Sequence, residues 1–306
     1  MAKKDKDMMD SSPKVKISRG ERIFGVFNVI ILTLFSVACI YPFWYVIVAS
    51  FSEASLLMSH PEAIMVPLGW STKAYEYVFE TKAIWTGYAN TILYVVVDTA
   101  INIFMTLLAA YFLSRKNLPG KTVLTILIMF TMYFSGGMIP GYLNIQQLGL
   151  YNTRWALLLP GALNTFNLII MRTALSGIDS ALEESAMLDG AGHMTILWKI
   201  LVPLSKATIA VLVLYYGVAH WNSWFPAFIY LDGDAKGKSM QPLQIVLRRI
   251  LILTDMTDTG SGEDAAQIAE TIKYATIIVS TVPILALYPF LQKYFTKGVM
   301  VGAVKG

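Results

Sequence analysis

The sequence has little cysteine and little charge, and each shortage excludes a class of protein. A single cysteine, Cys39, in 306 residues leaves no disulfide framework and no cysteine-based metal site. Charged residues make up 14% of the chain, against roughly a quarter in soluble domains. No Gly-x4-Gly-Lys-Ser/Thr segment is present, which argues against nucleotide chemistry in this chain. Because Cys39 lies inside an apolar run, we expect it to be a small buried hydrophobe.

Long apolar segments are what the chain has in abundance, since hydrophobic residues make up 56% of it. Repeated apolar runs of about 20 residues are long enough to cross a bilayer core. The short alternation typical of a membrane β-barrel strand is not seen. The sequence therefore predicts an all-α integral membrane protein. Its six spans are expected at about 22–50, 84–113, 121–139, 153–173, 205–231 and 271–295.

The charges that flank these spans predict their orientation. The net charge of +4 would suggest a nucleic-acid partner in a soluble protein, but here the basic residues lie at helix ends, so we expect none. Of 24 Lys and Arg residues, 16 fall in the segments that would face inward. This bias places both tails, residues 1–20 and 298–306, in the cytoplasm, with the membrane domain at 21–297. A polar island at 174–204 then also lies in the cytoplasm.

The polar island predicts a short helix. Ser180 followed by Glu183 fits a capping box, so a helix is expected to begin near Ala181. Gly190 and Gly192 can supply the left-handed turn that stops it after about two turns.

A second short helix is expected over 193–200, ended by Pro203. The first helix carries Ala186, Met187 and Leu188 on its surface and is too small to bury a core of its own. We predict that it docks in a groove of a partner; the alternative is a loop that packs beneath its own bundle. Catalysis by Glu184 or His193 is disfavoured, because no metal-ligand spacing or activated nucleophile accompanies them.

The island also carries a family motif. Glu184-Ser185-Ala186, then Gly190, then Ile200 and Pro203 match the spacing of the EAA motif: EAA, three residues, G, nine residues, I-x-L-P. The chain thus resembles the permeases of binding-protein-dependent ABC importers, with Ser185 and Val202 as conservative departures. Segments spread along nearly the whole chain share the resemblance: 41–43, 109–115, 221–225 and 297–306. The segment 134–140 is similar to the branch that takes up complex oligosaccharides.

The resemblance implies a six-span type I importer permease with a cytoplasmic coupling helix, in the cytoplasmic membrane of a bacterium. It implies a heterodimer with a second homologous permease, two cytosolic ATPase subunits and an extracytoplasmic sugar-binding protein. Membrane lipid would surround this chain. ATP and magnesium would bind the ATPases, and this chain would bind no cofactor or metal and would not be an enzyme. The implied coupling residues are Glu184, Ser185, Ala186, Asp189, Gly190, Ala191, Ile200 and Pro203.

The expected function is to form half of the pathway for a sugar or oligosaccharide, by alternating access driven by the ATPases. Sugar sites combine aromatic faces with amide hydrogen bonds. The candidate pathway residues are Asn164, Asn167, Trp221, Asn222 and Trp224.

Ionisable groups inside the predicted spans leave one alternative open. Asp98 lies near the middle of the second span, with Asn90 and Asn102 nearby. A carboxyl group at this depth is costly and usually faces a partner or a cavity. We expect it to form hydrogen bonds across helices. A stand-alone proton-coupled carrier that uses Asp98 is the alternative.

Overall fold

The computed structural model describes residues 18–60, 64–115, 119–257 and 270–286. Within these ranges the regular structure is helical, with one isolated antiparallel bridge between Ser52 and Trp70. The predicted all-α class is confirmed. Residues 1–17 of the predicted N-terminal tail, the predicted C-terminal tail and the end of the sixth expected span lie outside the described ranges.

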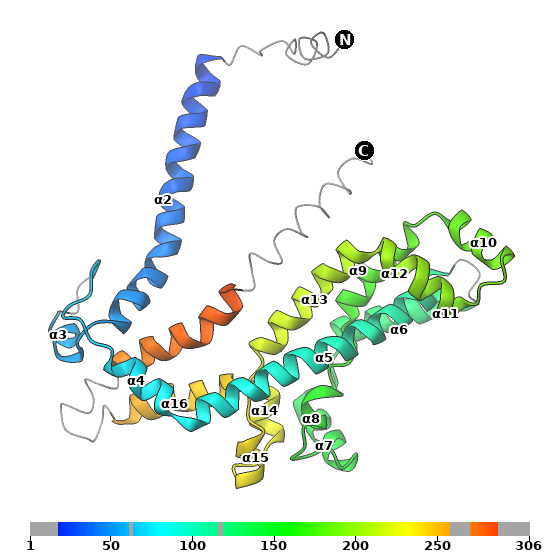
Figure 1. The fold of residues 1–306 in the computed structure, drawn as a ribbon. Coiled ribbons are helices and arrows are strands. Elements are labelled where there is room, and N and C mark those ends of the chain that lie inside the picture. Colours follow the sequence, from blue (N-terminus) through cyan, green and yellow to red (C-terminus); the bar gives the residue numbers. More distant parts are fainter. Residues whose placement is uncertain (1–17, 61–63, 116–118, 258–269, 287–306) are drawn as a thin grey trace.

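Helix α2 (Arg19–Ser50) corresponds to the first expected span and stands away from the other helices (Figure 1). Ser18 and Glu21 form a capping box that begins it. Only its last three residues, 48–50, are buried. The prediction that Cys39 is buried is therefore wrong, because no described part of the chain covers α2 at that position.

Helix α5 (Lys82–Ser114) is the axis of the remaining bundle. Its 33 residues give a length of about 50 Å, enough to cross a bilayer. It follows two short helices, α3 (Ala54–Ser59) and α4 (Lys73–Glu80). In α4, Ala74 and Val78 are buried and Tyr77 is exposed, as expected of an amphipathic segment.

The third and fourth expected spans are broken helices. Helix α6 (Lys121–Tyr133) ends at the Gly136-Gly137 pair, and α7 (Met138–Gln147) leaves at 111° to it. Over the range 153–173 the structure has α8 (Trp155–Leu158) and then α9 (Thr165–Ser176). Pro160 and Gly161 lie in the gap between them. One kinked helix is expected over this range. Two separate helices form instead, because Pro160 has no backbone N–H to donate to a helical hydrogen bond.

A bent arm connects α9 to α13. It consists of α10 (Ser180–Leu188), α11 (His193–Ile196), a π-helical turn at Leu197–Leu201 and α12 (Val202–Leu204). The arm then bends by 85° into α13 (Lys206–Trp221). Pro203 does not end the second short helix, which corrects the prediction. It lies in the first turn of α12, where a proline costs no hydrogen bond.

The segment after α13 is more ordered than the polar loop expected at 232–270. The fifth span stops at Trp221, and α14 (Phe225–Tyr230) and α15 (Ala235–Ser239) follow. Helix α16 (Leu243–Thr257) then packs against α5. The sixth expected span is helical over the described residues 270–286.

By length and apolar composition, α2 and α5 can each cross a membrane. Among the described residues, two bent helix pairs raise that number to four if each pair is one span. The count of six spans stays a prediction.

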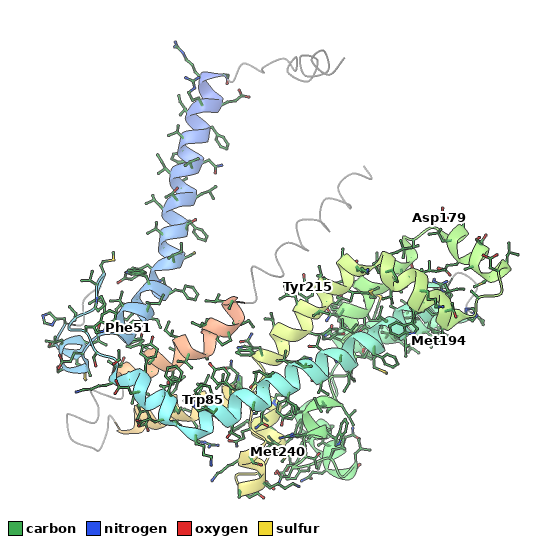
Figure 2. All side chains as sticks on the ribbon, in the orientation of Figure 1. Phe51, Trp85, Asp179, Met194, Tyr215 and Met240 are labelled. Atoms are coloured by element: carbon green, nitrogen blue, oxygen red, sulfur yellow. The ribbon has the colours of Figure 1, made fainter. Side chains whose placement is uncertain are left out.

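Two apolar cores lie at opposite ends of α5. In Figure 2, Asp179 and Met194 mark one end, while Trp85 and Met240 lie toward the other. The first core joins α5 to α9, α13 and the arm through Leu107, Ala110, Tyr111, Leu113, Leu168, Met171, Leu175, Ile196, Leu197, Leu201, Leu212 and Tyr216. The second joins α5 to α4, α16 and the 270–286 helix through Ala74, Val78, Ile84, Trp221, Leu243, Val246, Leu247, Ile272, Ala275 and Val279.

Candidate functional site

Helix α10, which carries the first part of the EAA-like motif, begins one residue earlier than predicted. The carboxylate of Asp179 caps it, with Oδ1 accepting from the backbone N–H of Ala181 at 3.0 Å. The predicted capping box of Ser180 and Glu183 is therefore wrong. Aspartate caps helices at least as well as serine, and the side chain of Glu183 is engaged elsewhere.

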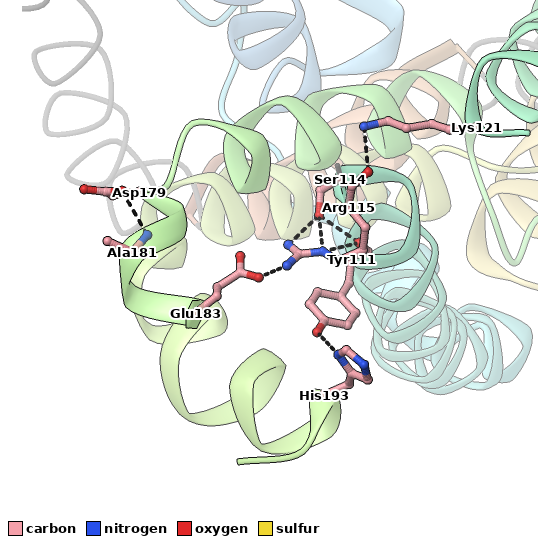
Figure 3. Close-up of polar contacts among 8 residues, drawn as sticks. All are labelled: Tyr111, Ser114, Arg115, Lys121, Asp179, Ala181, Glu183 and His193. Carbon is pink, nitrogen blue, oxygen red and sulfur yellow. Dashed lines mark hydrogen bonds and ion pairs between the residues drawn. The ribbon is translucent and has the colours of Figure 1, made fainter. Parts of the chain in front are cut away.

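Glu183 forms an ion pair with Arg115, the residue directly after α5 (Figure 3). The Arg115 guanidinium also donates to Ser114 Oγ at 2.8 Å and to the Tyr111 carbonyl at 3.2 Å, and it lies 4.3 Å from the centre of the Tyr111 ring. Burial lowers the pKa of Arg115 from its ordinary value, yet arginine keeps its charge in proteins. The pair thus connects α10 to the end of α5 through charges that are largely removed from water.

A second contact joins α5 to the arm. The Tyr111 hydroxyl and His193 Nδ1 are 2.9 Å apart (Figure 3). Lys121, the first residue of α6, donates to the Arg115 carbonyl at 3.0 Å. The end of α5 therefore contacts α6, α10 and α11 together.

The turn after α10 has a defined geometry. Gly190 has φ +81°, a left-handed conformation in which a side chain is strained. Its N–H donates to the Met187 carbonyl at 3.0 Å, and the N–H of Ala191 donates to the Ala186 carbonyl at 2.9 Å. These two bonds form a Schellman motif. Gly190 thus makes the predicted turn, whereas Gly192 has φ −75° and begins α11 instead.

The motif residues divide between an inner and an outer face of the arm. Ala186, Ala191 and Ile200 pack against the first core. The outer group is exposed: Glu184, Ser185, Asp189, Gly190 and Pro203. Beside it lie exposed apolar side chains, of which Leu188 is 90% exposed. A buried inner face and an uncovered apolar outer face are typical of a rigid docking element.

An open groove of about 870 Å³ lies between the arm and the end of α5. Its lining includes Tyr111, Arg115, Glu183, Glu184, Met187 and His193.

Comparison with known proteins shows which family the chain belongs to. A family profile described as "binding-protein-dependent transport system inner membrane component" matches residues 82–301. The chain belongs to this family. The resemblance to permeases of binding-protein-dependent importers is confirmed, and so is the permease fold that it implied.

Individual relatives agree over nearly the full length of this permease. The polygalacturonan/rhamnogalacturonan transport system permease protein YtcP of Bacillus subtilis is 42% identical over 290 residues, which are 93% of this chain and 99% of YtcP. Protein LplC of the same organism is 41% identical, covering 94% of this chain and 97% of LplC. A solved bacterial ABC transporter involved in the import of the acidic polysaccharide alginate contains a chain with a TM-score of 0.82 and 34% identity, covering 92% of this permease and 99% of that chain.

Asp98 of the permease lies in a polar network inside the bundle. Its carboxylate Oδ2 is 3.1 Å from Nδ1 of His220, and Nε2 of His220 is 2.6 Å from Oδ1 of Asn102. Asn102 donates its amide N–H to the Gly161 carbonyl at 2.8 Å. Its Oδ1 is therefore the acceptor, and His220 Nε2 carries a proton. The network links α5, α13 and the break before α9.

His220 is the residue of this network that sequence reasoning missed. The signal that points to it is a histidine inside an apolar helix, since such a group needs a polar partner. The Arg115–Glu183 pair has no such local signal, because its two residues are far apart in the sequence and Glu183 also fits a cap.

The five candidate pathway residues do not converge on one place. Asn164 caps α9 by accepting from the N–H of Asn167 at 3.1 Å. Trp221 is buried in the second core and donates to the carbonyl of Ser280 at 3.3 Å. Asn222 donates to the Val218 carbonyl at 2.9 Å. The Trp224 ring lies under the Arg248 guanidinium, and Trp221 also borders the apolar groove along α5 and α13. A substrate role for these residues stays a prediction.

Proposed function

We propose that this permease forms half of the pathway of an ATP-driven ABC importer and couples to a cytosolic ATPase through α10. The observation that carries the proposal is the construction of α10. It is capped at both ends, tied to α5 by the Arg115–Glu183 ion pair, and presents Leu188 outward with 90% of its surface exposed. Such a helix can transmit a displacement imposed by a partner, because the ion pair holds it to the end of α5.

The proposed transmission runs through two contacts. A partner that moves α10 would displace Glu183 and His193, and these would carry Arg115 and Tyr111 with them. Arg115 and Tyr111 lie at the end of α5, and α5 packs along α9 and α13. Displacement of α5 against these helices would open the pathway to alternate sides of the membrane. In this account ATP and magnesium act at the ATPase, and this chain supplies no group for hydrolysis.

A second permease subunit is the proposed neighbour of α2. Within the described ranges, this strongly apolar helix packs on the rest of the chain only from Tyr41 onward. An apolar groove of about 690 Å³ along α5 and α13 is a complementary surface for a helix of the partner. The proposed assembly is a heterodimer with two ATPases and a sugar-binding protein outside the cell. It places both termini and α10 in the cytoplasm of a bacterium.

The proposed substrate is an oligosaccharide that contains uronic acid. The relative YtcP is named for polygalacturonan and rhamnogalacturonan transport, and the similar solved transporter is involved in the import of an acidic polysaccharide. The sequence identities of 42% and 34% support a related substrate here.

Reconstitution tests this function against the proton-coupled carrier. The permease, its partner permease, the ATPases and the binding protein are placed in proteoliposomes, and uptake of a labelled oligogalacturonate is measured. Uptake that requires ATP inside and survives collapse of the proton gradient is expected. Uptake that persists without the ATPases, or that stops with the proton gradient alone, would favour the carrier.

A further inference from the structure

A cavity of about 300 Å³ lies between α14 and α16, at the opposite end of α5 from α10. Its lining includes Phe228, Leu231, Gln241, Ile245, Arg248 and Arg249. The volume is at the lower end of the range for small-molecule sites. It therefore suits one sugar unit and not a long chain.

Arg248 is the unusual residue of this cavity. Its guanidinium lies 4.2 Å from the centre of the Trp224 ring and 4.9 Å from that of Phe228. Stacking of this kind uses the flat face of the group and leaves its N–H donors at the edge available. Within the described ranges of the chain, these donors have no hydrogen-bond or ion-pair partner.

Three other arginines in the bundle have side-chain or aromatic partners. Arg115 is paired with Glu183. Arg154 donates to the Asn90 amide oxygen at 3.1 Å, and Arg249 donates to Gln241 Oε1 at 2.7 Å. Arg248 is half-buried but keeps its donors unused. A half-buried cation held in place by two aromatic rings is prepared to receive an anion.

The same residues match the chemistry of an acidic sugar. The apolar face of a pyranose ring packs against an aromatic side chain. A carboxylate on that ring matches the planar fork of a guanidinium, which can donate two parallel hydrogen bonds to it. Phe228 is the aromatic residue that lines the cavity, while Trp224, which the sequence singled out as a pathway candidate, lies outside the lining and holds the guanidinium of Arg248.

We infer that the cavity between α14 and α16 binds the carboxylate of one uronic-acid unit, with Arg248 as the donor, Phe228 as the aromatic residue of the lining and Trp224 as the residue that positions Arg248. This inference rests on the proposed function, in which the outer end of the bundle receives a saccharide. It adds the site that selects an acidic sugar over a neutral one.

Two measurements test the inference on the purified complex of permeases and ATPases. The first is calorimetric binding of trigalacturonate and of its neutral methyl ester. We expect the wild-type complex to bind the acid about tenfold more tightly than the ester, and Arg248→Met to remove that preference. Arg248→Lys should keep part of it, because lysine retains the charge but not the planar fork. Lys238→Met, which removes an exposed cation from α15, is the matched control and should bind like the wild type.

The second measurement is ATP hydrolysis stimulated by the binding protein loaded with trigalacturonate. At saturating binding protein, Arg248→Met should lower the stimulated rate by about tenfold. Equal binding of acid and ester by the wild type, or an unchanged preference in Arg248→Met, would overturn the inference. A loss of stimulated hydrolysis that is seen below saturation and is absent at saturating binding protein would also overturn it, since Arg248 would then be a contact to that protein. A wild-type complex that shows no stimulation would instead refute the proposed function, and the calorimetric result would still decide the site.

Discussion

The two ends of α5 are held in different ways. At the end near Lys82, side chains of α5 bond to the main chain of the segment around α15 and α16. Asn90 donates to two carbonyls, those of Ser239 and Gln241, and Tyr94 donates to that of Met240. At the end near Ser114, an ion pair and a tyrosine–histidine bond join α5 to the arm.

The difference concerns how easily each end can move. Hydrogen bonds to main-chain carbonyls and close helix packing fix the first end in one arrangement, because neither partner can turn without losing its contact. At the second end, the first core and these polar contacts join α5 to the arm, so a displacement of the arm is passed on to α5. In the proposed importer, one end of α5 is held by α16 and the other is driven through the arm. Each substitution below breaks or sharpens this comparison, from the largest expected effect to the smallest.

Removal of Glu183 is expected to have the largest effect. Glu183→Ala leaves the partly buried Arg115 guanidinium without its carboxylate, which should cost about 2–4 kcal/mol of unfolding free energy. Thermal unfolding of the purified permease measures the loss. Glu184→Ala removes the adjacent carboxylate, which is exposed, and should leave the unfolding temperature unchanged. Equal destabilisation by both variants would contradict the role given to the ion pair.

The fixed end can be tested at Gly87. A Cβ there would lie 3.0 Å from the Cα of Leu243 in α16, so Gly87→Ala should force the two helices apart and cost about 1–3 kcal/mol. Gly25 in α2 has no atom within 4 Å of such a Cβ. Gly25→Ala should therefore be neutral or slightly stabilising, since alanine favours the helix. Unfolding curves that coincide for the two variants would show that this packing is looser than described.

The turn after α10 should respond to a smaller change. Gly190→Ala places a Cβ at φ +81°, and we expect a cost of about 1 kcal/mol together with weaker recovery of the ATPase on co-purification. Gly192→Ala is the matched control, because φ there is −75°. If recovery of the ATPase is the same for both variants, the turn does not set the position of α10.

The smallest expected effect is at the cap of α10. Asp179→Ala removes the acceptor for the Ala181 N–H and should cost about 0.5–1 kcal/mol. Asp179→Asn keeps an acceptor oxygen and should retain most of the stability. Hydrogen exchange of the first turn of α10 measures the difference. Faster exchange in the asparagine variant than in the alanine variant would rule out capping by this side chain.

Much of the fold followed from the sequence because long apolar runs have few alternatives in a membrane. The lengths of α2 and α5 and the break at Gly136-Gly137 were predictable from runs of apolar residues and from glycine. The helix α16 was missed, although Leu243, Val246, Leu247 and Ile250 have the i, i+3, i+4, i+7 spacing of an amphipathic helix. These are the residues that face the second core.

The coupling element was predictable in position and less so in detail. The motif spacing located α10 and the turn at Gly190, because a helix stop of this kind needs glycine. The contacts of Glu183 were not predictable, since its partner Arg115 is 68 residues away in the sequence. Local rules favoured a cap made with Ser180, and a long-range ion pair took Glu183 instead.

Leu188 provides the most direct test of the claim that α10 couples this permease to an ATPase. Its side chain is 90% exposed at the last residue of α10, so Leu188→Lys should fold normally, and lysine is favourable near a helix C-terminus. Leu148→Lys makes the same change at the exposed C-terminal end of α7. We predict that Leu188→Lys lowers saccharide-stimulated ATP hydrolysis by the reconstituted complex at least about tenfold, with an unchanged unfolding temperature, while Leu148→Lys behaves as the wild type. Stimulated hydrolysis at the wild-type rate in Leu188→Lys would contradict the account.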